Sequence, residues 1–193
     1  MAVSSARRFF RELQGCGLLD ADQVASVRDR SSRKDSPVEI ARRLVADGTV
    51  TRWQARKLLQ GNHRFFHGKG NKYKLLRKIG RGGMGVVYKA EHVSIGRIVA
   101  LKVMSAELMK SSRNVSRFLR EIQITATLDH PNIIRAYDAD LDDGVYFLVM
   151  EYLRGRNVRD WLGTSARSVS FGTASDIILQ AAVGLQHVHA RNL

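Results

Sequence analysis

The feature that most constrains the fold is a glycine-rich stretch between two strand-like segments. Residues 79–90 read IGRGGMGVVYKA and contain three glycines in the spacing GxGxxG, at Gly80, Gly82 and Gly85. A Walker A loop needs Lys and then Ser or Thr after its last glycine, whereas two valines follow here. A dinucleotide-binding turn needs a helix after the glycines, but the alternating, β-branched segment VVYKAEH predicts a strand.

The remaining interpretation is a strand–loop–strand hairpin that folds over a chain of phosphates. Glycines let the backbone approach phosphate oxygens and donate N–H groups without Cβ atoms in the way. A plain glycine-rich hairpin without a ligand is the alternative. The GxGxxG spacing by itself does not separate these two interpretations.

A lysine and a glutamate further along the chain favour the phosphate interpretation. The sequence VALK, residues 99–102, lies in a strand-like run, and the period of two puts Ala100 and Lys102 on one face. Glu121 falls on the apolar stripe of a helix predicted over 116–128, where an unpaired carboxylate would be costly. We therefore expect Lys102 to pair with Glu121 and still present its charge to an anion. A structural salt bridge without a ligand is the alternative.

The segments around these residues predict an antiparallel sheet with a helix packed on it. Short runs rich in β-branched and aromatic residues are separated by turn signals. Short turns between consecutive strands favour antiparallel pairing, and the helix would cover one face of the sheet. The predicted fold class is therefore α+β, with strands at 73–79, 86–92, 97–104, 132–140 and 145–152.

The region of residues 1–62 predicts a small all-helical module. Ser36, Pro37 and Glu39 supply a helix cap, a first-turn proline and a capping-box acid. The segments GLLDADQ and GTVTRWQ are offset by 31 residues and resemble each other, so we expect two related helix pairs. The module shows no obvious chemistry, which favours an adaptor or regulatory role. Its expected core consists of Phe9, Leu13, Val24, Val27, Ile40, Leu44 and Leu58.

Residues 63–72 predict a linker between the helical module and the sheet-forming region of residues 73–193. This linker segment, HRFFHGKGNK, is rich in glycine and basic residues. Its histidines, His63 and His67, are spaced as metal ligands can be, but ordinary surface histidines are the simpler interpretation. We therefore predict no metal ligands in the chain.

Composition bounds the remaining classes of function. The net charge of +14 is spread over both halves of the chain, which favours basic solvated faces over nucleic-acid recognition. The longest apolar run, Val145 to Met150, is too short to cross a membrane, and the N-terminus has no apolar secretory segment. The single cysteine, Cys16, excludes an internal disulfide. We expect a cytoplasmic location, no nucleic-acid partner and no membrane segment in this chain.

Taken together, the motifs of residues 73–193 resemble those of the protein kinases, and specifically the bacterial serine/threonine kinases of eukaryotic type. The glycine loop, the strand lysine in VALK, the helix glutamate in RFLREIQITATLDHPNII and the hinge-like LVMEYL occur in the family's order and spacing. The resemblance implies a kinase N-terminal lobe, with a five-stranded antiparallel sheet and its helix C, followed by the first helices of the C-terminal lobe. The N-terminal module together with WQARKLLQG also resembles planctomycete-type kinases.

The resemblance implies a phosphate-binding role for one group of residues. The glycine loop, residues 79–87, would cover the phosphates of ATP. Lys102 would hold the α- and β-phosphates while paired with Glu121, and these two are the catalytic residues that the resemblance assigns.

A second group would bind the adenine. Val87 and Ala100 would sandwich the ring, Met150 would be the gatekeeper, and the backbone of Glu151 and Leu153 would hydrogen-bond the adenine edge. The full set of implied ATP-binding residues is Ile79, Gly80, Arg81, Gly82, Gly83, Met84, Gly85, Val86, Val87, Ala100, Lys102, Met150, Glu151 and Leu153.

Some of the family's catalytic parts are not found in this sequence. The family's H-R-D-x-x-x-x-N loop supplies the aspartate that accepts the substrate proton, and its asparagine and the D-F-G aspartate hold Mg²⁺. The segment HARNL is not that loop, because Asn192 stands in place of the aspartate and the spacing fits the end of a helix. We therefore expect the Mg²⁺ ligands to lie beyond Leu193.

Two functions consequently compete. The first is an ATP-dependent serine/threonine protein kinase, a transferase acting on protein hydroxyls, present here as a truncated chain. The second is a catalytically inactive, nucleotide-binding or regulatory pseudokinase fragment. A third interpretation keeps the basic N-terminal helices as a nucleic-acid or partner-binding module.

The truncated chain is expected to transfer no phosphate, to bind ATP weakly and to be poorly soluble. Its last helix would expose the stripe Ile177, Ile178, Ala181, Leu185 and Val188.

Overall fold

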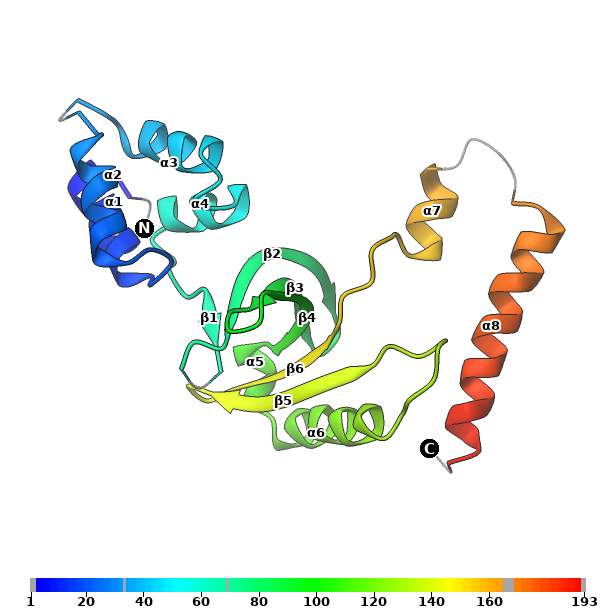
Figure 1. The fold of residues 1–193 in the computed structure, drawn as a ribbon. Coiled ribbons are helices and arrows are strands. Elements are labelled where there is room, and N and C mark those ends of the chain that lie inside the picture. Colours follow the sequence, from blue (N-terminus) through cyan, green and yellow to red (C-terminus); the bar gives the residue numbers. More distant parts are fainter. Residues whose placement is uncertain (1–2, 33, 69, 165–168, 192–193) are drawn as a thin grey trace. The chain divides into compact units, whose positions relative to one another are not determined.

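A computed structural model describes residues 3–32, 34–68, 70–164 and 169–191 (Figure 1). The chain divides into two compact units. The first contains residues 1–80 and 88–97, and the second contains residues 81–87 and 98–193.

The helical module of the first unit consists of two similar helix pairs. Helices α1 (Ala6–Gly15) and α2 (Ala21–Asp29) form the first pair, and α3 (Pro37–Ala46) and α4 (Arg52–Leu59) form the second, beginning 31 residues later. The predicted cap of α3 is confirmed, because Ser36 and Glu39 form a complete capping box, and α2 and α4 start with the same arrangement. The equivalent glycines, Gly17 and Gly48, have positive φ angles of 66° and 71° in the turns within each pair.

One hydrophobic core joins the four helices, which Figure 1 shows as one group. Phe9, Leu13 and Leu58 have no exposed surface, and Ile40 and Leu44 are 1% and 2% exposed. All seven predicted core residues belong to this cluster. The same cluster contains Phe65, which lies in the segment predicted to be a linker.

The segment 63–72 is therefore more structured than its glycine-rich composition suggests. Phe65 is 1% exposed, and strand β1 (Phe66–His67) pairs antiparallel with β2. The physical reason is that two adjacent aromatic residues bury enough apolar surface to order a segment that glycines would otherwise leave mobile. The division of the chain at residue 62 stays a prediction.

Helix α4 is bound to the backbone of β2 (Tyr73–Gly82), the strand that leads into the glycine loop. The Gln54 side chain is 1% exposed and donates a 2.7 Å hydrogen bond from Nε2 to the Leu75 carbonyl oxygen. The Thr51 hydroxyl donates a 2.7 Å hydrogen bond to the Leu76 carbonyl oxygen. Trp53 adds an edge-on ring contact of 5.6 Å with Tyr88 of the next strand. The helical module is therefore attached to this part of the sheet by buried polar contacts.

These contacts predict a measurable loss of stability for Gln54→Ala. The substitution removes a capping-box partner and leaves the buried Leu75 carbonyl without its donor, which should cost about 1–3 kcal/mol beyond the loss of the cap. Gln23→Ala is the matched control, because Gln23 accepts the same capping hydrogen bond, from Asp20 at 3.0 Å, but is exposed to solvent. Urea unfolding should show a clearly larger loss in the free energy of unfolding for Gln54→Ala than for Gln23→Ala. Equal losses would show that the contact with β2 contributes nothing.

The strands form a six-stranded sheet in the order β1-β2-β3-β4-β6-β5. Its other members are β3 (Gly85–His92), β4 (Arg97–Met104), β5 (Ala136–Asp142) and β6 (Val145–Glu151). Strand β6 pairs antiparallel with both β4 and β5, and Lys102 lies opposite Leu148 in the β4–β6 register. The five predicted strands are present, and β1 is the addition.

Helices α5 (Ala106–Met109) and α6 (Ser112–Ala126) follow β4, and Figure 1 shows α6 running alongside β5. The predicted helix over 116–128 is confirmed as α6, although it starts four residues earlier because Ser111 caps it. Strand β5 begins at Ala136 rather than at 132, since Pro131 and Asn132 form a turn in which the Ile133 N–H donates to the His130 carbonyl oxygen at 3.0 Å.

Two further helices, α7 (Val158–Thr164) and α8 (Phe171–His189), follow the sheet. Helix α8 exposes much of its predicted apolar stripe, with Ile178 and Leu185 being 68% and 53% exposed. Gly184 is the buried point of this helix, where an added Cβ would lie 3.2 Å from the carbonyl oxygen of Asn132. Among the described residues, no helix has the length and hydropathy needed to cross a membrane.

Candidate functional site

The glycine-rich stretch forms the predicted hairpin between β2 and β3. Gly83 and Met84 make the turn, Gly82 ends β2 and Gly85 begins β3. Gly82 and Gly83 are exposed, and a Cβ added to either would meet no atom within 4 Å. A ligand could therefore approach the backbone of this turn without meeting another side chain, as the phosphate interpretation requires.

Gly85 has a different environment from the other glycines of the loop. It is buried, and an added Cβ would lie 2.1 Å from the carbonyl oxygen of Val103 on β4. The backbone of β3 thus approaches β4 directly next to Lys102. Only a residue without a Cβ permits this approach.

The contrast between these glycines gives a second prediction. Gly85→Ala should force the start of β3 away from β4 and lower the free energy of unfolding by about 1–3 kcal/mol, as overpacked sites do. Gly83→Ala is the control, because nothing lies within 4 Å of its Cβ position. Thermal unfolding followed by circular dichroism measures both. Equal melting temperatures for Gly85→Ala and Gly83→Ala would contradict the packing argument.

The expected pair of Lys102 and Glu121 is formed. Lys102 Nζ donates a hydrogen bond to Glu121 Oε1 and thereby joins β4 to α6. The two side chains are 17% and 35% exposed, so that the pair is neither sealed in the core nor freely solvated. The ammonium group also lies 5.9 Å from the ring centroid of Phe118, which is fully buried. The lysine is therefore held by two partners on α6 and remains accessible.

A small apolar cluster lies next to this pair. Met104, Phe118 and Leu148 form its buried centre, and Met84 from the turn of the glycine loop packs against it. A hollow of about 170 Å³ between the loop and α6 is lined by Gly83, Met84, Met104, Leu108, Asn114 and Arg117. These apolar side chains exclude water from one side of Lys102. The electrostatic attraction between its ammonium group and an anion is therefore stronger than it would be in bulk water.

The residues expected to bind adenine lie along β4 and β6. Ala100 is 6% exposed and stands opposite Met150 in the antiparallel register. Glu151 ends β6, and Leu153, two residues later, is 61% exposed. The N–H of Leu153 makes no backbone hydrogen bond within the described part of the chain. The register thus brings Ala100, Met150 and the segment after β6 into one region of the second unit.

The other predicted residues lie on the hairpin itself. Val86 and Val87 are half-buried on β3, while Ile79 is 37% exposed on β2 and Arg81 is exposed near its end. Gly80 is half-buried on the same strand.

Arg135 is a residue that sequence reasoning missed. Its backbone N–H donates to Glu151 Oε1 at 2.8 Å, and the Glu151 N–H donates to the Arg135 carbonyl oxygen at 2.9 Å. Its guanidinium group pairs with Asp129. These bonds fix the C-terminal end of β6, Glu151, next to the residues expected to bind adenine. The contact depends on the β5–β6 register, which the sequence pattern did not specify to the residue.

Metal-binding potential is low in the part of the chain that the structure describes. No group of three or more His, Cys, Asp or Glu side chains there is arranged to hold a metal ion. His63 instead contacts the Glu12 carboxylate through Nδ1 at 2.8 Å.

Comparison with known proteins identifies the family. The family model for the protein kinase domain matches residues 73–193. The match covers more than half of the chain and contains the glycine loop, Lys102, Glu121 and the hinge. The chain therefore belongs to the protein kinase family.

Relatives of known sequence and structure are bacterial kinases. The chain is 38% identical over 121 residues to serine/threonine-protein kinase Pkn1 of Myxococcus xanthus. The aligned region covers 63% of this chain and 17% of Pkn1. The chain is 34% identical over 122 residues to serine/threonine-protein kinase PrkC of Bacillus subtilis, and this alignment covers 63% of this chain and 19% of PrkC. The crystal structure of the Mycobacterium tuberculosis PknI kinase domain matches with a TM-score of 0.54 and 28% identity. That match covers 63% of this chain and 50% of the crystallised one.

These comparisons confirm the fold class and the bacterial serine/threonine kinase resemblance. The chain spans less than a fifth of the length of either named kinase and half of the crystallised domain. The family match begins at Tyr73, so the planctomycete-type resemblance of the N-terminal module stays a prediction.

Proposed function

We propose that residues 73–193 form the ATP-binding part of a serine/threonine protein kinase that transfers the γ-phosphoryl group of ATP to protein hydroxyls. The observation that carries the proposal is the ion pair between Lys102 and Glu121, formed beside a glycine-rich turn whose Gly82 and Gly83 are exposed and have no neighbouring atom at their Cβ positions. A structural salt bridge alone would not need the lysine to stay partly exposed or the adjoining glycines to be open.

In this proposal the phosphates of ATP lie between the hairpin and β4. The N–H groups of Gly82 and Gly83 and the ammonium group of Lys102 bind phosphate oxygens, and Glu121 holds the lysine in place. The charge of the lysine is thereby fixed before the nucleotide arrives, so that little reorganisation is needed on binding.

The adenine lies against β4 and the hinge. Ala100 leaves room for a flat ring, Val87 covers the ring from the same side, and Met150 bounds the pocket behind it. The Leu153 N–H and the Glu151 carbonyl offer one donor and one acceptor for the adenine edge.

The remaining catalytic parts come from outside these residues in the family. Mg²⁺ would neutralise the charge of the phosphates, and its ligands, together with the aspartate that accepts the substrate proton, belong to family motifs that residues 73–193 do not include. Residues 1–62 would serve as a regulatory or adaptor module attached to this lobe. The protein substrates are those of the class that carries Ser or Thr hydroxyls, and the expected location is cytoplasmic.

The proposal predicts that nucleotide affinity depends on Lys102. Lys102→Met removes a charge-assisted contact with phosphate worth about 1.5–3 kcal/mol, which corresponds to roughly a 10- to 150-fold weaker affinity for ATP. Lys110→Met is the control, because Lys110 is also a lysine of the second unit but is exposed at the end of α5. Titration calorimetry with ATP and ADP measures both variants. Equal affinities for the wild-type protein and Lys102→Met would refute the assignment of the site.

A further inference from the structure

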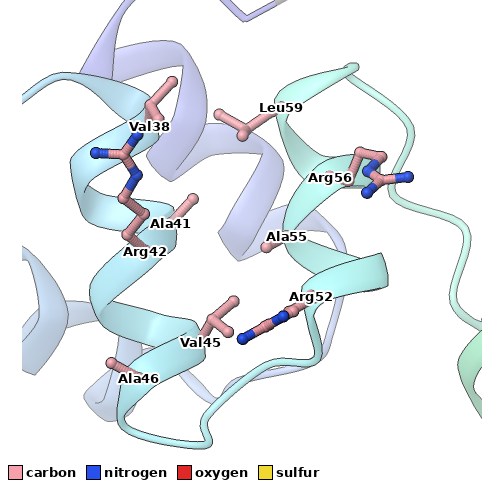
Figure 2. Close-up of a pocket in the computed structure, with 9 residues that line it drawn as sticks. All are labelled: Val38, Ala41, Arg42, Val45, Ala46, Arg52, Ala55, Arg56 and Leu59. Atoms are coloured by element: carbon pink, nitrogen blue, oxygen red, sulfur yellow. The ribbon is translucent and has the colours of Figure 1, made fainter.

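The helical module contains a groove that the nucleotide site does not use. It lies between α3 and α4 and has a volume of about 760 Å³ (Figure 2). Volumes of roughly 300–1,000 Å³ accommodate drug-sized ligands or several side chains. Its apolar lining consists of Val38, Ala41, Val45, Ala46, Ala55 and Leu59, and its charged lining consists of Arg42, Arg52 and Arg56. We call this the α3–α4 groove.

The equivalent place in the first helix pair is filled by the chain's own side chains. The 31-residue repeat pairs Phe10 with Ala41 and Arg28 with Leu59. In the first pair the Arg28 guanidinium group lies over the Phe10 ring, 5.3 Å from its centroid, and Phe10 is only 7% exposed. In the second pair an alanine replaces the phenylalanine, and the groove stays open. Two copies of one architecture thus differ in whether the groove is occupied.

The arginines of the α3–α4 groove lie outside the salt bridges of the described residues. Within the described ranges, none of Arg42, Arg52 and Arg56 forms a salt bridge, and all three are exposed. Arg52 and Arg56 are four residues apart on α4, a spacing at which like charges destabilise a helix. Figure 2 shows the Arg52 side chain reaching from α4 toward Val45 of α3, into the groove. An anionic group placed there would remove this repulsion.

The acidic residues near α3 are engaged in other contacts. Asp35 pairs with Arg43, and that hydrogen bond holds the pKa of Asp35 below its usual value. Hydrogen bonds from the backbone and hydroxyl of the N-cap serine lower the pKa of Glu39. Asp47 lies 3.8 Å from Arg30. Asp35 and Asp47 are therefore engaged away from the groove, whereas the attraction between Glu39 and Arg42 also lowers the pKa of Glu39 and partly offsets the charge of Arg42.

The other side of α4 extends the same charge. Arg52 and Arg56 also line a second hollow of about 400 Å³, which reaches to β2 and β3 and contains no acidic residue. The remaining lining residues of this hollow are Thr51, Trp53, Leu76, Arg77, Lys78 and Lys89. The positive charge around α4 is thus continuous rather than a single exposed arginine.

We propose that the α3–α4 groove is the docking site for an acidic amphipathic helix of a partner protein. Apolar side chains of that helix would lie on the floor formed by Ala41 and Ala55, whose small side chains allow close approach. Its carboxylates would pair with Arg42 and Arg52. A nucleic acid is disfavoured as the occupant, because the groove is lined by aliphatic rather than aromatic side chains, and phosphate contacts need no apolar floor.

The experiment measures binding of a fluorescent helical peptide to the complete 193-residue chain by fluorescence anisotropy. The peptide is about 18 residues long, with leucines at every third or fourth position and glutamates on the flanking positions. We expect Arg42→Glu/Arg52→Glu to weaken its binding roughly tenfold, since two ion pairs become two repulsions. Arg7→Glu/Arg11→Glu is the matched control with the same charge change on α1, and it should bind as the unaltered chain does.

A charge-neutral variant tests the apolar floor separately. Ala41→Phe introduces the side chain that the first helix pair carries at the equivalent position and should block binding without altering charge. If its melting curve shows that it is unfolded, Val38→Gln replaces it, because Val38 is 45% exposed and a neutral polar side chain there removes apolar lining without altering charge. The proposal is overturned if no peptide binds, if the α1 control loses affinity equally, or if the folded floor variant binds unchanged. Equally tight binding by a leucine-free glutamate peptide or by a DNA duplex would also overturn it.

Discussion

The ion pair between Lys102 and Glu121 is the contact on which the account of this protein depends. It connects β4 with α6, two elements that are separated by a turn and a short helix in the chain. A carboxylate on the inner stripe of a helix is costly unless it is paired, so the glutamate fixes the position of the lysine. Because the pair is only partly buried, the lysine can also contact a ligand. Phe118 and the close approach of Gly85 to β4 support the same geometry from both sides.

The helical module extends this organisation toward the N-terminus. Its four helices repeat one helix–turn–helix pattern twice, and the second copy has diverged in two respects. Gln54 and Thr51 of α4 reach the backbone of β2, whereas the equivalent Gln23 is a solvent-exposed capping residue. The second copy also leaves its groove open where Phe10 fills the first. One copy therefore serves the module's own packing, and the other provides its external contacts.

Much of the fold could be predicted from the sequence, because its signals are local. The capping box at Ser36, the 31-residue repeat and the alternation of β-branched residues specified α3, the pairing of similar helices, and the hairpin of β2 and β3. The pairing of Lys102 with Glu121 also followed from two local patterns. What the sequence did not specify depends on long-range register: the burial of Phe65, the contact of Arg135 with Glu151 and the hydrogen bond from Gln54 to Leu75. No periodicity reports which strand a side chain will meet.

The central claim is that the phosphates of a nucleotide lie next to Lys102, and a labelling measurement tests it most directly. An acyl-phosphate derivative of ATP transfers its acyl group to the amine of a lysine held beside the phosphates, forming an amide and releasing ATP. After incubation with the 193-residue chain, peptide mass spectrometry identifies the acylated lysines. The account predicts preferential labelling of Lys102, suppressed by excess ATP, with exposed lysines such as Lys110 labelled weakly and insensitively to ATP. Labelling of Lys102 that matches Lys110 and does not respond to ATP would contradict the account.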